Sequence, residues 1–273
     1  MDKADVYRIT DTLDEASLEV MATRLEVRGR HPRFVAMLKE YVDAMGLHPN
    51  DRVLDLGCGT GVASREIARR PGFAGRVTGI DRSAYLVAVA KTRALEERLS
   101  DWLEFEVGDS RSLGLPDASF DAAVAHTLLS HVEDPLEVLR EMARVVRPGG
   151  IVGIFDGDYA SMTFAGADAQ SGRETDAAIV EAIATSPRVM RDMPGLLHRA
   201  GLQLQAAFAH VVADIGKADF FAGTIPSFVK LLPRAGAMTE PQAAAWAKEM
   251  LERSERGAFF GATNFYSYVA RRP

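Results

Sequence analysis

The chain has 273 residues, of which 47% are hydrophobic and 26% charged, a composition that can bury one large core or two small ones. Its formal net charge of −6 argues against a general attraction to nucleic acid or to anionic membranes. A single cysteine excludes an internal disulfide and a cysteine-based metal cluster. The sequence contains no apolar leader and no apolar run of membrane-spanning length, so we expect a cytoplasmic protein without a membrane partner.

Two helices are predicted between about residues 14 and 45, because apolar residues recur at helical spacing before and after Pro32. The segment between them is basic and contains Arg24, Arg28, Arg30, His31 and Arg33. It is either a solvated charge cluster or the source of an arginine that holds a carboxylate, a group that the planar guanidinium fits well. For the second role we expect Arg30.

A glycine-rich turn follows the apolar run that begins at Val53, with Gly57, Gly59 and Gly61 at alternate positions before a helical pattern. This layout predicts a buried strand, a tight turn and a helix N-terminus, where free N–H groups can meet a polar or anionic ligand. The spacing lacks the extra residue of the dinucleotide-binding pattern and the Gly-Lys-Ser/Thr ending of a phosphate-binding loop. Asp55 precedes the turn at the carboxyl end of the strand, where open α/β sheets bind ligands. Taken alone, the motif also fits a turn without a ligand.

A second predicted strand, Arg76–Ile80, ends in Asp81. This aspartate lies about twenty residues beyond the glycines, the usual interval for an acid that accepts hydrogen bonds from both ribose hydroxyls. The alternative is that Asp81 caps the helix that begins near Ser83. The ribose role is favoured because strand, glycine turn, helix, strand and acid occur together.

Further strands alternate with helices and also end in polar residues. Leu103–Val107 leads to Gly108, Asp109 and Ser110, Ala122–Ala125 stops at His126, and Ile151–Phe155 precedes two acids. This alternation predicts a parallel, doubly wound sheet. The last third of the chain carries two helices, a strand, a long helical region and a final strand, at residues 173–185, 187–200, 203–214, 217–256 and 262–270. The long helical region exceeds an ordinary loop and is predicted to be a functional element or an interface.

Five ordered segments resemble the successive motifs of class I S-adenosylmethionine-dependent methyltransferases, in particular the branch that includes ubiquinone- and menaquinone-biosynthesis enzymes. They are Val53–Ser64, Gly79–Asp81, Gly108–Asp109, Ser119–Asp121 and Arg147–Gly150. The resemblance covers about residues 30–160. It implies a single domain over residues 1–273 with a doubly wound, Rossmann-like sheet of seven strands and an antiparallel last strand. Residues 1–50 would be N-terminal helices, 51–160 the cofactor-binding core, and 161–273 the remaining strands with a helical insert at about 217–256. The first helices and this insert are the two elements expected to form the substrate lid.

The resemblance also implies S-adenosyl-L-methionine as the cofactor and assigns residues to its parts. Asp55 and the glycine turn would hold the methionine part, with Cys58 as a packing residue in the turn rather than a nucleophile. Asp81 would bind the ribose. The remaining cofactor residues are Arg82 beside the adenine, Asp109 on its amino group with Gly108 and Ser110 flanking it, and His126 and Thr127 near the sulfonium.

Methyl transfer mainly requires alignment of donor and acceptor, and a general base is needed only if the acceptor must lose a proton. The predicted catalytic residues follow the fourth and fifth strands and are His126, His131, Asp158 and Tyr159; Asp156 is a further candidate base. His131 lies in a segment that can equally serve only to lead into the next helix. The two acids lack further ligands, so no metal site is predicted.

The resulting expectation is methyl transfer to a small apolar or aromatic molecule. The alternatives are a cofactor-binding protein with other chemistry, such as cyclisation or cofactor modification, and a non-catalytic scaffold subunit. Absence of an Asn/Asp-Pro-Pro-Tyr motif argues against a nucleic-acid acceptor. The sequence leaves the acceptor atom and a homodimer open.

Overall fold

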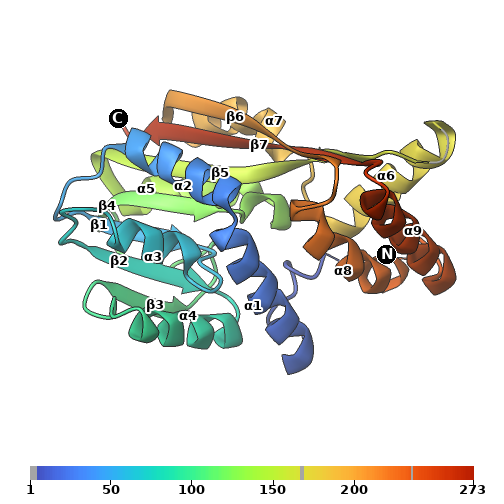
Figure 1. Cartoon of the computed structure of the whole chain (residues 1–273). Helices are drawn as coiled ribbons and strands as arrows, with labels where there is room; N and C mark the ends of the chain where they lie inside the picture. Colours follow the sequence, from blue (N-terminus) through green and yellow to red (C-terminus); the bar gives the residue numbers. More distant parts are fainter. Residues whose placement is uncertain (1–4, 167–168, 235) are drawn as a thin grey trace.

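A seven-stranded sheet with the strand order β3-β2-β1-β4-β5-β7-β6 forms the centre of the computed structural model, which describes residues 5–166, 169–234 and 236–273 (Figure 1). The strands β1 to β5 pair in parallel, whereas β7 pairs antiparallel with both β5 and β6. The predicted sheet class and its antiparallel last strand are therefore confirmed. The strands are β1 Arg52–Leu56, β2 Arg76–Asp81, β3 Leu103–Val107, β4 Phe120–His126, β5 Val146–Phe164, β6 Gln203–Gly216 and β7 Phe259–Arg271.

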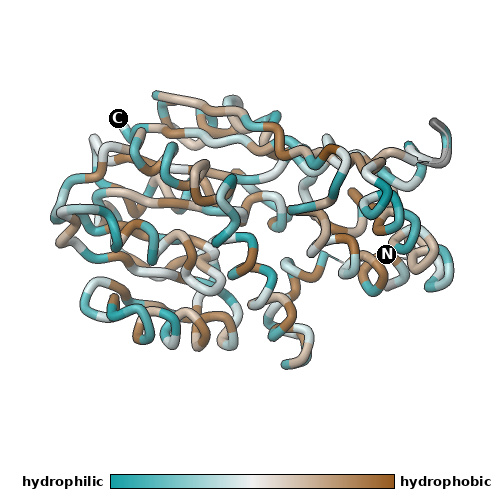
Figure 2. The backbone as a smooth tube through the Cα atoms, viewed as in Figure 1, coloured by the Kyte–Doolittle hydropathy of each residue, from teal (hydrophilic) through white to brown (hydrophobic). Residues whose placement is uncertain are grey.

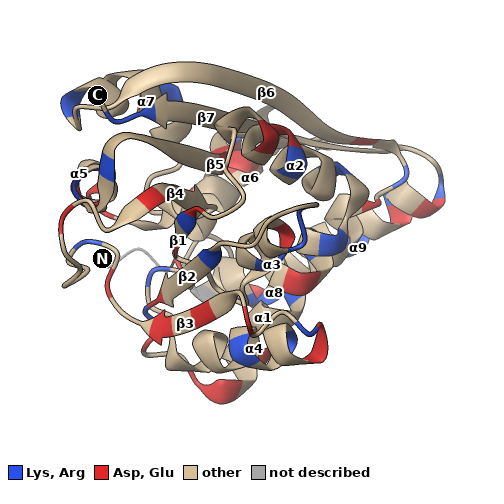
Figure 3. Ribbon diagram, turned by 90° about the vertical axis from the view of Figure 1, so that its left-hand side faces the viewer, with Lys and Arg blue, Asp and Glu red and all other residues tan. Residues whose placement is uncertain are grey.

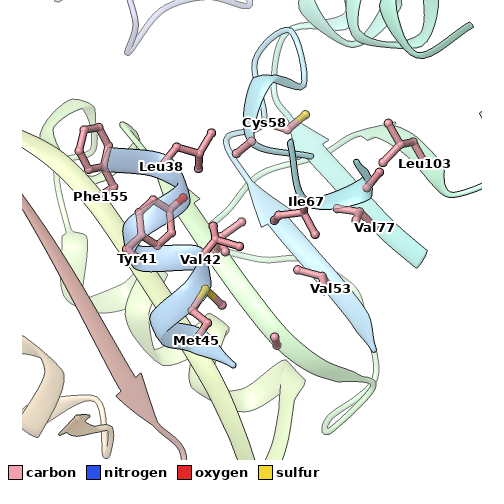
Figure 4. Packing of buried hydrophobic residues seen from close by; sticks show 14 of the residues in the cluster. Leu38, Tyr41, Val42, Met45, Val53, Cys58, Ile67, Val77, Leu103 and Phe155 are labelled. Carbon is pink, nitrogen blue, oxygen red and sulfur yellow. The ribbon is translucent and has the colours of Figure 1, made fainter. Parts of the chain in front are cut away.

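Helices cover both faces of the sheet, and their apolar sides form two separate cores. Val53 and Leu54 are neighbours in β1 and point to opposite cores, which explains the uninterrupted apolar run that a strand buried on both faces requires. Figure 4 shows the first core, where Tyr41 and Val42 of α2 lie close to the sheet. Along the helices, hydrophobic and hydrophilic stretches alternate (Figure 2). The helices are α1 Glu15–Arg30, α2 Pro32–Met45, α3 Val62–Ala68, α4 Ala84–Glu96, α5 Pro135–Val145, α6 Ala169–Ile183, α7 Val189–Arg199, α8 Phe220–Arg234 and α9 Glu240–Glu255, with a short 3₁₀ turn at Leu129–His131.

The strand β5 continues nine residues beyond the predicted end at Phe155, because it stays paired with β7. Buried acids interrupt the apolar pattern there, and each is satisfied: Asp156 accepts hydrogen bonds from the backbone and hydroxyl of Ser130, and Asp158 pairs with Arg191. The far ends of β5 and β7 carry a third core with α6, α8 and α9. The predicted helical region thus consists of two helices, α8 and α9, set beside the main sheet (Figure 1).

Positively and negatively charged residues are interspersed along the helices and loops (Figure 3). None of the helices within the described residues is long and apolar enough to cross a bilayer. The expected lack of a nucleic-acid partner stays a prediction.

A buried ion pair fastens α1 to the glycine turn and α3. Both Nη2 contacts of Arg65 to Glu26 measure 2.9 Å, and both side chains are almost fully buried. Nη1 of the same arginine donates to the carbonyl oxygen of Thr60 in the turn. The pair therefore sets the position of α1 over the ligand edge of the sheet.

Replacing Glu26 with alanine should lower the free energy of unfolding by about 3 kcal/mol, because it leaves a buried guanidinium without its main partner. This loss of stability lies at the lower end of the range typical of broken buried ion pairs, because Glu97 still lies 3.0 Å from Nε of Arg65 and partly compensates its charge. Urea denaturation measures the change. Glu252→Ala, which breaks an exposed pair with Lys248, is the matched control and should change stability by less than about 1 kcal/mol. Equal effects of the two substitutions would contradict the anchoring role.

Candidate functional site

The carboxyl ends of β1, β2, β3 and β4 meet at a cavity of about 110 Å³, which we call the cofactor cavity. Adjacent parallel strands bring the polar residues that end them to one edge, so segments far apart in the sequence line one space. The wall also includes a segment that precedes α1 and residues of α1 itself. The lining includes Tyr7, Thr10, Leu25, Arg28, Asp55, Gly57, Cys58, Gly59, Thr60, Asp81, Arg82, Gly108, Asp109, Ser110, His126, Thr127 and His131.

The glycine turn bends tightly along this cavity. Gly57 and Gly59 have φ angles of 64° and 54°, which favour glycine. A Cβ atom at Gly57 would lie 2.7 Å from a side-chain carbon of Leu128, so a larger residue would collide with the opposite wall. Between them, Cys58 is buried, and burial together with the charges of Asp81 and Asp55 raises the pKa of its thiol. A protonated, packed thiol agrees with the packing role predicted for this residue.

The carboxylate of Asp81 closes the turn from the end of β2. One of its oxygens accepts from the backbone N–H of Gly59 and the other from that of Ser83, each at 2.9 Å. Ser83 is the residue that caps α4, so Asp81 supports the helix start and faces the cavity at the same time. Burial raises the pKa of Asp81, although the two hydrogen bonds oppose this. Each carboxylate oxygen keeps a second lone pair for a ligand.

Asp55 borders the cofactor cavity and has one carboxylate oxygen without a partner among the described residues. Its Oδ2 accepts from the backbone and hydroxyl of Ser64, at 3.1 and 2.6 Å. Its Oδ1 is buried and has no hydrogen-bond partner within the part of the chain that the structure describes. Burial raises the pKa of Asp55 to about 7, against the opposing hydrogen bonds from Ser64. A buried orphan acceptor is costly, so this geometry indicates a ligand group that donates a hydrogen bond or carries a positive charge.

At the other side of the cavity, Asp109 is held by Arg111, whose Nη2 lies 2.7 Å from the carboxylate, and this hydrogen bond lowers the pKa of Asp109. Gly108 and Ser110 line the cavity beside it. Arg82 also lines it, but its guanidinium donates to the carbonyl of Arg8 and to Asp11. The structure therefore brings together the residues predicted to lie near the adenine. The side chain of Arg82 is hydrogen-bonded to the segment before α1.

The structure corrects the choice of arginine in the basic segment. The side chain of Arg30 is 70% exposed, contacts Glu26 and lies outside the cavity. Arg28 instead lines it, and its Nη2 donates to the hydroxyl of Thr127 at 2.7 Å. Thr127 has a φ of 59°, an uncommon conformation for a β-branched residue and one that concentrates at functional sites. The two arginines are two positions apart and so point about 200° apart on a helix, which the sequence alone did not resolve.

The two predicted histidines are in different environments. His126 stacks on Phe155 with 4.7 Å between the ring centroids, and its Nδ1 lies 3.2 Å from the hydroxyl of Tyr41. Burial and the charge of Arg28 lower the pKa of His126 to about 3, so the ring is neutral near pH 7. His131 is also buried, but its Nδ1 lies 2.9 Å from the carboxylate of Asp5. That carboxylate was not predicted to belong to the site.

A second cavity, of about 280 Å³ and called here the acceptor cavity, adjoins the first. Tyr7, Leu25, Arg28 and His131 line both. The wall is largely apolar and comes from α1, α8, β5 and β7, so it includes both elements expected to form the lid. Within this wall, the hydroxyl of Thr263 is a buried polar group for which the described residues provide no hydrogen-bond partner.

The remaining predicted catalytic residues differ in position. Tyr159 lines the acceptor cavity, and burial followed by the charge of Asp156 raises the pKa of its hydroxyl, so the phenol is a hydrogen-bond donor rather than a base. Asp158 lines neither cavity, and its buried carboxylate is paired with Nε of Arg191 at 2.8 Å. This placement argues against the catalytic role predicted for Asp158 and favours a structural one.

Comparison with known proteins agrees with this arrangement. Residues 54–154 match the family described as "Methyltransferase domain". Methyltransferase GfsG of Streptomyces halstedii is 31% identical over 211 residues, which cover 75% of this chain and 69% of that protein. The chain belongs to the class I S-adenosylmethionine-dependent methyltransferase family. Its cofactor is S-adenosyl-L-methionine, and the glycine cradle, the free lone pairs of Asp81 and the orphan oxygen of Asp55 fit such a molecule.

Other relatives show how far the likeness extends. The 27-O-demethylrifamycin SV methyltransferase of Amycolatopsis mediterranei is 34% identical over 71% of this chain and 65% of that protein. The chain spans 65% or less of the length of several other curated relatives. Among solved structures, the [4+2]-cyclase SpnF shares the fold with a TM-score of 0.62 at 22% identity, over 99% of this chain and 98% of that one. At this identity the likeness concerns the fold alone.

Proposed function

We propose that this protein transfers the methyl group of S-adenosyl-L-methionine to a hydroxyl group of a small, largely apolar molecule. The observation that carries the proposal is the junction of the two cavities, where His131 faces both and Arg28 and Tyr7 border it. Nε2 of His131 has no hydrogen-bond partner within the described ranges, so its lone pair is available to an acceptor. An oxygen acceptor is supported by the relative named 27-O-demethylrifamycin SV methyltransferase.

Residues of the two cavities have different roles in this reaction. When bound, the cofactor supplies an electrophilic methyl group on a sulfonium for in-line displacement. Asp81 would accept hydrogen bonds from the ribose hydroxyls, Asp55 would pair with the ammonium group, and Arg28 would pair with the carboxylate of the methionine part. His131 takes the acceptor's proton, and the apolar wall of the second cavity excludes water and aligns the acceptor, a contribution of about 7–11 kcal/mol in favourable cases.

An assay of S-adenosylhomocysteine release with a panel of phenols, hydroquinones and aliphatic alcohols tests the proposal. We expect turnover with at least one apolar hydroxylated compound and none with its methyl ether. Release that occurs only with amines, or cyclisation of a polyene without release of S-adenosylhomocysteine, would overturn the oxygen assignment. Cofactor binding without any conversion would favour the scaffold alternative.

The affinity for S-adenosylhomocysteine should rise with pH up to about pH 7 and then level off. The carboxyl of Asp55 has a pKa of about 7, and a neighbouring ammonium group favours its ionised form, so binding below pH 7 releases a proton. One released proton corresponds to a change in Kd of at most about tenfold per pH unit. Calorimetry between pH 5.5 and 8 measures the slope. Asp55→Asn should flatten it, and a slope that persists in this variant would assign the proton to another group.

A further inference from the structure

The segment 5–13, which we call the strap, contributes to the walls of both cavities. Tyr7 and Thr10 form part of the wall of the cofactor cavity, and Val6 and Tyr7 part of the acceptor cavity. Polar contacts fasten it to the core: Arg82 donates to the backbone of Arg8 and to Asp11, and the side chain of Arg8 pairs with Glu133. The strap is therefore held on the side where cofactor and acceptor meet.

At the beginning of the strap, Asp5 is 0% exposed and reaches a histidine 126 positions later in the chain. Its carboxylate lies 2.9 and 3.1 Å from Nδ1 of His131. The backbone N–H and the hydroxyl of Thr185 both donate to it at 2.9 Å, and the N–H of Tyr7 donates at 3.0 Å. A buried carboxylate with this many donors is rigidly held, and the imidazole is one of the groups that it holds.

This contact determines which nitrogen of His131 can act as a base. An ionised carboxylate only accepts hydrogen bonds, so Nδ1 must carry the proton. In the neutral ring Nε2 then has the lone pair, and this is the nitrogen left free toward the cavities. The ring of Tyr7, 4.7 Å from that of His131, restricts its rotation further. A carboxylate that fixes the tautomer also stabilises the imidazolium that forms when the base takes a proton.

We propose that Asp5 is a positioning residue for the catalytic base, and that the strap delivers it to His131 from outside the sheet. The assignment of His131 as the base rests on the proposed function, whereas the coupling of Asp5 to His131 can be tested without turnover. The active site is then complete only with the strap in place, because no other carboxylate in the described part of the chain contacts Nδ1 of His131.

Several groups besides Asp5 face this imidazole. They are Asp156 in β5, Arg28 in α1 and the phenols of Tyr159 and Tyr7. Burial alone would lower the pKa of His131, but the charge and hydrogen bond of Asp5, followed by the charge of Asp156, raise it above its usual value. Removal of the Asp5 charge should therefore move the acidic limb of the pH–rate profile to lower pH. A purely structural loss would reduce the rate without moving that limb.

The experiment compares wild type, Asp5→Asn and Glu15→Gln, each bound to S-adenosylhomocysteine, by NMR titration of histidine rings. His131→Gln identifies the His131 resonance. In Asp5→Asn we expect a lower pKa of His131, with kcat reduced by about ten- to a hundredfold, by analogy with the loss of the carboxylate partner of a metal-bound histidine. Glu15→Gln removes the same charge from an exposed position in the first turn of α1, just beyond the strap, without touching His131 or the contacts that fasten the strap, and should leave the His131 titration as in wild type.

An unchanged His131 titration in Asp5→Asn, or equal shifts in both variants, would overturn the proposal. Thermal melting of the three proteins, together with their affinity for S-adenosylhomocysteine, verifies that the variants are folded. The titration does not depend on an acceptor. If wild type methylates no hydroxylated compound, the proposed function fails, while the coupling between Asp5 and His131 is still decided by NMR.

Discussion

Replacing Asp81 with alanine is expected to weaken the binding of S-adenosylhomocysteine by two to four orders of magnitude. A hydrogen bond to a charged group is worth about 1.5–3 kcal/mol, so two ribose hydroxyls account for about 3–6 kcal/mol, or roughly 10²- to 10⁴-fold in Kd. The orientation of the Asp81 carboxylate is fixed before the cofactor binds, because the N–H groups of Gly59 and Ser83 each donate to one of its oxygens. Isothermal titration calorimetry of the purified protein measures the loss.

Two further variants separate recognition from local unfolding. Asp81→Asn keeps the size of the side chain but loses the charge, and should fall between wild type and alanine. Glu106→Ala removes an exposed acid from the neighbouring strand β3, opposite Ile80, and should leave Kd within about threefold of wild type. Unchanged affinity in a folded Asp81→Ala protein would contradict the ribose assignment. It would favour the alternative that Asp81 only caps a helix.

Replacing His131 with glutamine should lower kcat by about 10²- to 10⁴-fold, the usual contribution of a general base. The affinity for S-adenosylhomocysteine should stay within about threefold, because no cofactor group is assigned to this side chain. Wild-type kcat/KM should rise with pH through the pKa of His131, which lies above 6.5, because only the neutral ring accepts a proton. Steady-state kinetics from pH 5.5 to 9 with the best acceptor provides both quantities.

Other histidines supply the comparison. His198→Asn changes an exposed residue of α7 and should not alter the kinetics. His126→Asn should act mainly on cofactor binding, since the low pKa of His126 leaves it a poor base. A loss of kcat in His126→Asn comparable to that in His131→Gln would contradict the assignment of His131 as the sole base and point to His126.

The cofactor half of the site follows from the sequence because its determinants are local. The glycine turn, Asp55, Asp81 and Asp109 each end a strand, and alternating strands and helices can only form a parallel sheet whose carboxyl ends share one edge. Local pattern and topology were therefore enough to predict the parallel sheet and its ligand edge, and the resemblance to class I methyltransferases added the antiparallel last strand, the cofactor and the residues assigned to it.

The residues near the acceptor cavity and their partners could be identified only from the tertiary structure. The rotation of α1 about its axis turns Arg28 rather than Arg30 toward the cavities. Arg191 in α7 pairs with Asp158 and neutralises its charge. Asp5 meets His131 across 126 positions of sequence. A buried carboxylate has the same sequence signature whether it faces a ligand, an arginine or a histidine. Long-range packing supplies its partner, and the partner determines whether it has a structural or a functional role.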